Sequence, residues 1–145
     1  MNWKKEAIDK LKEYNARKQS IASIPMEIAQ LESAVRGIRS ASADGSAISG
    51  GGSGREDMLL SNICKREELK RLLSTSKAWV SQVDAAMAVL NQEERLILDR
   101  FFIHPARGNV DRLCGELGIE KSQVYVRRDS ALHHFTISLY GCSEI

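Results

Sequence analysis

The chain has 145 residues, of which 43% are hydrophobic and 28% are charged, and its formal net charge is +2 at pH 7. This length suits one compact domain or a small domain with a helical extension, and the composition is too apolar for a disordered chain. The small net charge excludes a polybasic protein that binds any polyanion, so a nucleic-acid site would have to be a local cluster of cations.

Neither a membrane span nor a secretory leader is expected from the sequence. The longest uncharged run, Ser130–Ser143, is too short and too polar to cross a bilayer. The first residues lead directly into a charged helical pattern rather than an apolar leader core. The three cysteines are odd in number and far apart, which predicts reduced thiols rather than a disulfide framework. We therefore expect a cytoplasmic protein without a membrane partner.

Residues 1–39 predict an N-terminal helical segment, because apolar side chains recur every three or four positions. Pro25 falls inside this pattern, and a proline removes one backbone donor from a helix. Either Pro25 opens a new helix with Ser23 near its cap, or it kinks one long helix; the break is the favoured prediction. The clearest run has the spacing of a coiled-coil or helical-hairpin seam and consists of Ile21, Ile24, Ile28, Leu31, Val35 and Ile38.

Residues 40–54 differ in composition, with five glycines and five serines, and predict a flexible linker. A phosphate-binding loop would need a Gly-Lys-Ser/Thr step after a strand, and the segment has neither. We therefore expect no nucleotide cofactor.

Residues 55–90 contain no Gly or Pro and predict a long helix that packs on the N-terminal segment. Its apolar stripe is interrupted by Arg66 and Ser76. The same stripe could pair within one chain or between two copies, and the sequence leaves this open. The stripe consists of Leu59, Ile63, Leu69, Leu73, Val80, Val83, Met87 and Leu90.

Residues 91–145 predict a helix-turn-helix domain. Asn91 is expected to cap a helix that ends near His104. A short helix follows over residues 110–117, and Gly118 stands where a tight turn requires a positive φ angle. Ser122 is the expected N-cap of a second helix, which runs over residues 123–132 and on toward residue 140. Val124, Ala131 and Leu132 are expected to hold this second helix to the core.

The start of the second helix carries a local cluster of cations, with three between residues 121 and 128 and no anion. Arginine can bind guanine or phosphate through two donors, glutamine can read adenine, and the first turns of a recognition helix contact base edges. The candidate DNA-binding residues fall into two groups. Expected at bases or the groove edge are Lys121, Ser122, Gln123 and Tyr125, and expected at phosphate or guanine are Arg127 and Arg128.

The alternative for this stretch is an ordinary solvated helix face. In that case Arg127 or Arg128 would pair with Glu116 or Glu120.

Two stretches resemble the fourth region of bacterial sigma factors, the helix-turn-helix that reads the upstream promoter element: LNQEERLIL at residues 90–98 and LCGELGIEKSQVY at residues 113–125. The wider layout of helical N-terminus, Gly/Ser loop, long helix and C-terminal sigma-like module resembles phage late-gene transcriptional regulators of the ArpU/RinA type. This resemblance implies a phage or prophage DNA-binding regulator, most simply an activator, in the cytoplasm of a bacterial host. Its candidate partners are double-stranded DNA, RNA polymerase and a second copy of the chain.

Catalytic and metal-ligating patterns are not recognisable in the sequence. His133 and His134 are adjacent and would point about 100° apart on a helix, whereas a zinc set needs closely spaced cysteine or histidine pairs. We therefore expect an all-α protein that is not an enzyme and needs neither metal nor cofactor. Two alternatives stay open: a DNA-binding packaging subunit similar to small terminase subunits, and a coiled-coil interaction protein that does not bind DNA.

Overall fold

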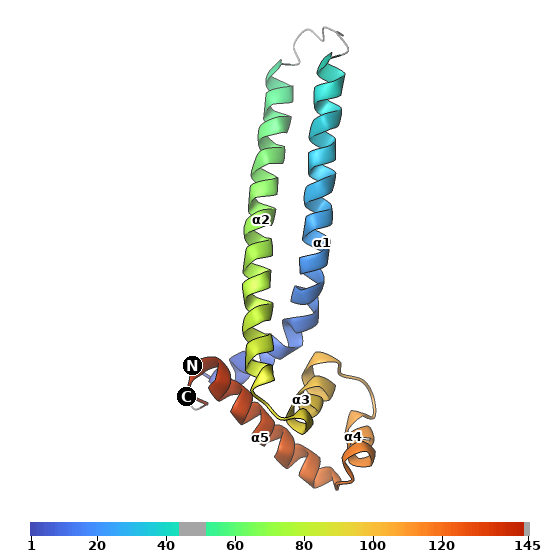
Figure 1. Ribbon diagram of the computed structural model, residues 1–145, viewed down its shortest axis with the longest axis vertical. Helices are drawn as coiled ribbons and strands as arrows, with labels where there is room; N and C mark the ends of the chain where they lie inside the picture. Colours follow the sequence, from blue (N-terminus) through green and yellow to red (C-terminus); the bar gives the residue numbers. More distant parts are fainter. Residues whose placement is uncertain (44–51, 144–145) are drawn as a thin grey trace. The chain divides into compact units, whose positions relative to one another are not determined.

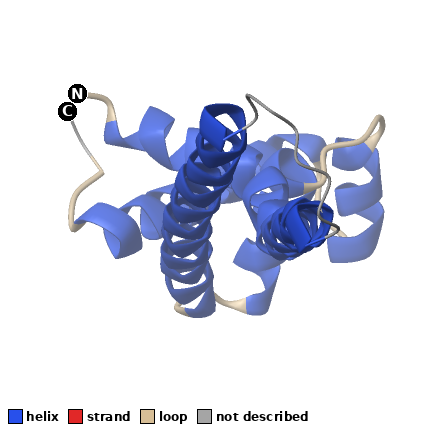
Figure 2. Ribbon diagram, turned by 90° about the horizontal axis from the view of Figure 1, so that it is seen from above, coloured by secondary structure: helices blue, strands red, loops and turns tan. Residues whose placement is uncertain are grey.

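The computed structural model describes residues 1–43 and 52–143, and all regular elements in these ranges are helices (Figures 1 and 2). The predicted all-α fold is thus confirmed. None of the described helices combines the length and the apolar character that a membrane span requires. The elements are α1 (Trp3–Ala43), α2 (Gly52–Ala88), α3 (Gln92–Leu98), the short π-helix η1 (Asp99–Ile103), α4 (Asn109–Leu117) and α5 (Lys121–Tyr140).

Two compact units make up the chain, and their boundaries cut through both long helices. The hairpin unit is Lys18–Ala78, and the C-terminal unit joins Met1–Arg17 to Trp79–Ile145. The predicted ranges 1–39, 55–90 and 91–145 follow helix ends and changes in composition, whereas the two units follow side-chain packing.

Within the hairpin unit, α1 and α2 lie side by side and antiparallel (Figure 1). Ser20 Oγ donates a hydrogen bond to Ser76 Oγ (3.0 Å), and Asn62 Nδ2 donates to the Leu31 carbonyl (2.9 Å), so rising numbers on α1 meet falling numbers on α2. The predicted seam run on α1 is confirmed, because Val35 is buried and the other five members are half-buried. The long helices therefore pair within one chain.

The α2 side of this seam is more polar than the sequence analysis expects. Asn62 and Ser76 are buried (8% and 5% exposed), whereas Ile63 is 47% exposed, so the prediction that Ile63 lies on the stripe is wrong. Along α2, the seam follows alternating steps of three and four residues, from Leu59 to position 62 and then to Arg66. Position 63 does not lie on this path. The buried amide is satisfied, because Asn62 Oδ1 also accepts a hydrogen bond from Arg66 Nε (2.8 Å).

Pro25 lies inside α1, so the predicted break of the helix is wrong. The proline leaves one helical carbonyl without its usual donor, which costs up to about 3 kcal/mol in a helix interior. Cross-helix hydrogen bonds from Ser20 and to Leu31 lie on either side of it. Packing on both sides of the proline therefore maintains a helix that the local sequence disfavours.

Both ends of the predicted linker at residues 40–54 are helical, because α1 continues to Ala43 and α2 begins at Gly52. Residues 44–51, where the rest of this prediction falls, lie outside the described residues.

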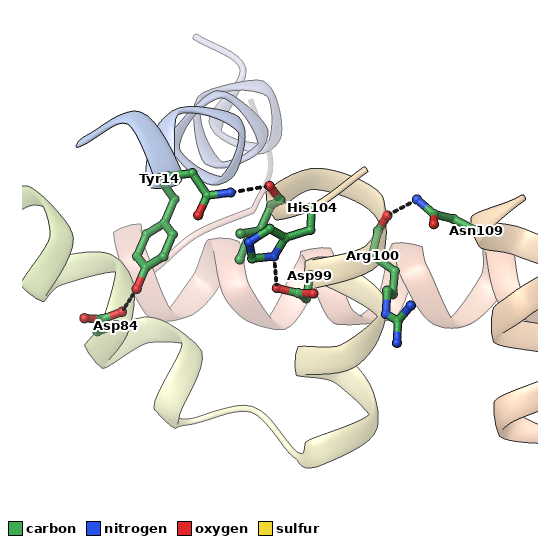
Figure 3. Close-up of polar contacts among 8 residues, drawn as sticks. Tyr14, Asp84, Asp99, Arg100, His104 and Asn109 are labelled. Atoms are coloured by element: carbon green, nitrogen blue, oxygen red, sulfur yellow. Dashed lines mark hydrogen bonds and ion pairs between the residues drawn. The ribbon is translucent and has the colours of Figure 1, made fainter. Parts of the chain in front are cut away.

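The C-terminal unit has a main core in which the first turns of α1 pack with the end of α2 and with α5. Beside this core, the Tyr14 hydroxyl donates a hydrogen bond to Asp84 Oδ1 (2.6 Å; Figure 3). Burial and the neighbouring carboxylate raise the pKa of Tyr14 to about 12. The buried members of the main core are Ala7, Leu11, Val83, Ala86, Leu90, Leu98, Ile103, Ala131, Leu132 and Phe135.

Helix α3 begins as predicted, with Asn91 as its N-cap. The Asn91 side chain accepts a hydrogen bond from the Glu94 backbone (2.8 Å), and Glu94 Oε1 accepts one from the Asn91 backbone (3.2 Å), which completes a capping box. The other Glu94 oxygen lies 2.5 Å from His134 Nδ1 of α5. The start of α3 is thereby tied to α5.

Candidate nucleic-acid interface

Helices α4 and α5 are joined by a turn of three residues that begins at Gly118. Gly118 has φ 64° and ψ 37°, the left-handed conformation that the sequence predicts, and its N–H donates to the Cys114 carbonyl (2.9 Å). The N–H of Ile119 donates to the same carbonyl (3.3 Å). These bonds close the end of α4 and allow α5 to start within three residues.

A second, smaller core holds this helix pair against α3. Ile97 of α3, Leu113 of α4 and Val124 of α5 are fully buried in it. Cys114 and Ile119 are partly buried against it. The predicted inward positions of Val124, Ala131 and Leu132 are therefore confirmed, and the opposite side of α5 is left to solvent.

The first turn of α5 is open. Lys121, Ser122 and Gln123 are exposed, and Tyr125 is 38% exposed. The prediction that Ser122 caps the helix is wrong: Glu120 is the N-cap, and it has no side-chain capping bond. Glu120 already has the extended backbone of a cap (φ −76°, ψ 158°), and its carbonyl accepts from the N–H of Gln123, so Ser122 falls inside the first turn.

Arg127 and Arg128 have partners different from those in the predicted helix-face alternative. Arg127 forms an ion pair with Glu93 of α3, where the side chains are 41% and 35% exposed. Glu116, an alternative partner in that reading, pairs instead with Arg100 (3.1 Å). Arg127 is thus directed toward α3, away from the other candidate residues.

Arg128 is held on the other side of α5. Its Nε and Nη2 donate to Asp129 Oδ1 (3.2 and 3.1 Å). Its guanidinium carbon lies 5.1 Å from the ring centre of Phe101 and 5.1 Å from that of Tyr125. Arg128 therefore stays close to Tyr125, although its donors already have a partner.

Phe101 reaches this position from η1, a single π-helical stretch at the end of α3. The stretch is fixed by polar contacts (Figure 3). His104 Nδ1 lies 2.9 Å from Asp99 Oδ1, the His104 N–H donates to the Asp99 carbonyl (2.7 Å), and Asn109 Nδ2 donates to the Arg100 carbonyl (2.5 Å). Such π-turns frequently mark functional sites, and nothing in the sequence pattern predicts this one.

Next to the open turn of α5 is a hollow of about 370 Å³. Lys121 and Tyr125 line it from α5, and Phe101 and Asp111 line it from η1 and α4. The first turn of α4 and the first turn of α5 therefore share one surface.

Two exposed cations outside α5 were absent from the sequence prediction. Arg107 lies in the loop before α4, between Ala106 and Gly108, which line the hollow, and Arg112 lies on α4. Among the described residues, neither has an ion-pair partner. Because they belong to a loop and to a different helix, a search for a basic run near Lys121 does not find them.

Within residues 1–43 and 52–143, no three His, Cys, Asp or Glu side chains are grouped so that they could hold a metal ion. Cys64, Cys114 and Cys142 are free thiols.

The chain matches no protein-family model, and comparisons with curated proteins and with solved structures found no match. The likeness to sigma region four therefore rests on the quoted sequence motifs.

Proposed function

We propose that the chain is a sequence-specific DNA-binding transcriptional regulator of a phage or prophage operon, with α5 as its recognition helix in the major groove. The observation that carries this proposal is the open first turn of α5. It projects from a short helix pair that is fixed by Gly118 and by the Leu113–Val124 core, and it presents polar side chains that have no partner within the described chain.

Each exposed side chain on this turn suits a different contact. The Gln123 amide can donate to and accept from an adenine edge, which is worth about 1–3 kcal/mol of discrimination against another base. The Lys121 ammonium can bind a phosphate or a guanine, and the Ser122 hydroxyl can bind either a base or the backbone. The Tyr125 ring stands one turn further along α5 and can reach the groove edge.

Affinity that does not depend on the DNA sequence would come from exposed cations on α4, on α5 and in the loop before α4. Lys121, Arg107 and Arg112 can each neutralise a DNA phosphate, whereas Asp111, which lines the hollow together with Lys121, opposes them. Each phosphate contact contributes roughly 0.9 to the slope of log affinity against log salt concentration. Three contacts give a slope of about −3, a moderate salt dependence that fits a chain of low net charge.

The biological context of the proposal comes from the resemblance to ArpU/RinA-type regulators. It places the protein in the cytoplasm of a bacterial host, as an activator that works with RNA polymerase. We assign the hairpin unit to RNA polymerase or to a second copy of the chain, because none of the candidate DNA-binding residues lies within Lys18–Ala78.

The test is selection of DNA by the purified full chain from a randomised duplex pool, followed by affinity measurements on the selected sequence. We expect one sharp motif, and we expect Gln123→Ala to relax the preference at particular positions. Lys121→Ala should weaken binding to every sequence, while Lys77→Ala, which removes the same charge from the exposed surface of the hairpin unit, should have little effect.

Two outcomes would favour the alternatives. Strong binding without a motif, together with rings of many subunits, would indicate a packaging subunit. Absence of binding even at low salt would indicate a helical interaction protein and would overturn the proposal.

A further inference from the structure

The environment of Arg128 is unusual for a residue on the exposed side of a recognition helix. Its guanidinium carbon lies at equal distances, 5.1 Å, from the centres of two aromatic rings. Those rings, Phe101 and Tyr125, lie 6.0 Å apart at an angle of 64°, which is an edge-to-face arrangement. The three side chains therefore form one stack that joins η1 to α5, and we refer to it below as the Phe101–Tyr125–Arg128 stack.

The charge of Arg128 is also partly neutralised. Two of its nitrogens donate to Asp129 Oδ1, and the side chain is only 30% exposed. A phosphate would have to compete with a carboxylate that is already bonded. Lys121 is different, because it is exposed and has no partner within the described chain.

Tyr125 is the member of the stack that remains accessible to a ligand. Its ring contacts Phe101 and Arg128, while the residue stays 38% exposed and lines the hollow together with Lys121. Within the described chain, no hydrogen-bond partner is found for its hydroxyl. The hydroxyl is therefore available to a ligand, and the ring that carries it is restrained.

We infer that Arg128 is a positioning residue, which holds the ring of Tyr125 against Phe101 so that the tyrosine acts as a specificity-determining contact with a DNA base edge. This inference rests on the proposed function, and it assigns different roles to neighbouring cations: Lys121 binds the DNA backbone, and Arg128 sets the direction of Tyr125. The rigid ring loses little freedom on binding, and its hydroxyl can donate to an acceptor on a base or accept from a donor.

The first test uses the salt dependence of binding, because a phosphate contact and a positioning role change it differently. Affinities for the selected duplex and for duplexes with single base-pair changes would be measured over a salt series. The proteins would be the wild type, Arg128→Lys, Arg128→Met, Tyr125→Phe, the double variant Arg128→Lys/Tyr125→Phe and Lys121→Ala. Arg128→Lys keeps the positive charge but removes the planar group that lies against the two rings.

We expect Arg128→Lys to reduce discrimination at the same base pair as Tyr125→Phe, by about fivefold to tenfold, with the salt slope unchanged. Lys121→Ala should instead lower the slope by about 0.9 and weaken all duplexes alike. The double variant Arg128→Lys/Tyr125→Phe should discriminate no worse than Tyr125→Phe alone, because both changes remove one contact. If Arg128→Lys binds like the wild type while Arg128→Met lowers the slope, Arg128 is a phosphate contact and the inference is wrong.

A second readout needs no DNA. The guanidinium carbon of Arg128 lies 5.1 Å from the centres of both rings, so the NMR signals of the neighbouring δ-protons should be shifted upfield in the wild type and should move back in Phe101→Leu. Unshifted signals in a folded wild-type protein would overturn the stack itself. If the stack is seen but selection returns no motif, the proposed function fails and the specificity role of Tyr125 fails with it. If a motif is found but the stack is absent, only the positioning role fails.

Discussion

Gly118 and Gly115 offer a matched pair of alanine substitutions with opposite expected effects on stability. A Cβ atom built at either glycine meets no heavy atom within 4 Å, so steric clash plays no part at either position. The two differ in backbone conformation alone: Gly118 has φ +64°, whereas Gly115 lies inside α4. The effect of each substitution therefore comes from backbone preference.

The magnitudes follow from that difference. Placing a β-carbon in the left-handed conformation costs about 1–2 kcal/mol, so Gly118→Ala should lower the free energy of unfolding by that amount. Gly115→Ala should raise it by about 0.5–1 kcal/mol, because alanine loses less entropy in a helix than glycine. Gly118→Asn should recover part of the loss, since asparagine tolerates the left-handed region better than alanine.

Urea unfolding followed by tryptophan fluorescence measures the relevant unit. The chain has two tryptophans, Trp3 and Trp79, and both belong to the C-terminal unit that contains α4 and α5. A free energy of unfolding that is unchanged or raised in Gly118→Ala would refute the reasoning. It would mean that Gly118 does not hold the left-handed conformation in solution.

Three further predictions concern polar contacts away from the turn. The raised pKa of Tyr14 means that its hydrogen bond to Asp84 stabilises the fold fully below pH 10 and is lost as the pH rises through about 12. In tryptophan-detected unfolding, Tyr14→Phe should cost about 1 kcal/mol at neutral pH and show a shallower loss of stability between pH 10 and 12 than the wild type; equal slopes would contradict the assignment. Asn62→Leu should raise the thermal midpoint of the hairpin helices in circular dichroism and produce additional oligomers in size-exclusion chromatography, because a buried polar seam residue trades stability for a single pairing; a lowered midpoint with one sharp species would be the opposite result. Glu93→Gln should increase DNA affinity severalfold and steepen its salt dependence, because it releases Arg127 and removes an anion, while the free energy of unfolding should change by less than about 1 kcal/mol; an unchanged salt slope would show that Arg127 remains out of reach of DNA.

The features that the sequence predicts well are those set by neighbouring residues. The Asn91 cap, the Gly118 turn and the run from Ile21 to Ile38 each depend on spacing within a few residues, and the structure has all three. The all-α class follows from the same local signals.

The wrong predictions at Pro25 and Ile63 arise where distant contacts outweigh local preference, whereas the predicted Ser122 cap is wrong for a local reason, because Glu120 already has the extended backbone of a cap. Pro25 is helical because α1 and α2 bond to each other on both sides of it, and Asn62 replaces Ile63 on the seam because the Leu31 carbonyl and Arg66 satisfy its amide. The bonds from Ser20 to Ser76 and from Asn62 to the Leu31 carbonyl join residues far apart in the sequence, so the local pattern does not show them. At a helix seam the apolar Ile63 is expected to be buried rather than its polar neighbour Asn62. The register of the opposite helix determines which of the two is buried.

In the candidate interface, too, the sequence predicts the surroundings of some residues and not those of others. Lys121, Ser122 and Gln123 lie on an exposed turn as expected from helix spacing. The pairing of Arg127 with Glu93 joins residues 34 positions apart, and the stack on Arg128 depends on a π-turn that brings Phe101 to α5. A sequence pattern identifies these arginines as cations, whereas their partners are determined by packing.

The most direct test of the central claim is the ratio of affinities of the purified chain for its selected duplex and for a scrambled duplex of the same composition, at physiological salt. The account predicts a ratio of about 10³ or more, in the range of specific DNA-binding proteins, and predicts that Gln123→Ala lowers it without changing the affinity for the scrambled duplex. A ratio near one, or no salt-dependent binding to either duplex, would contradict a sequence-reading role for α5.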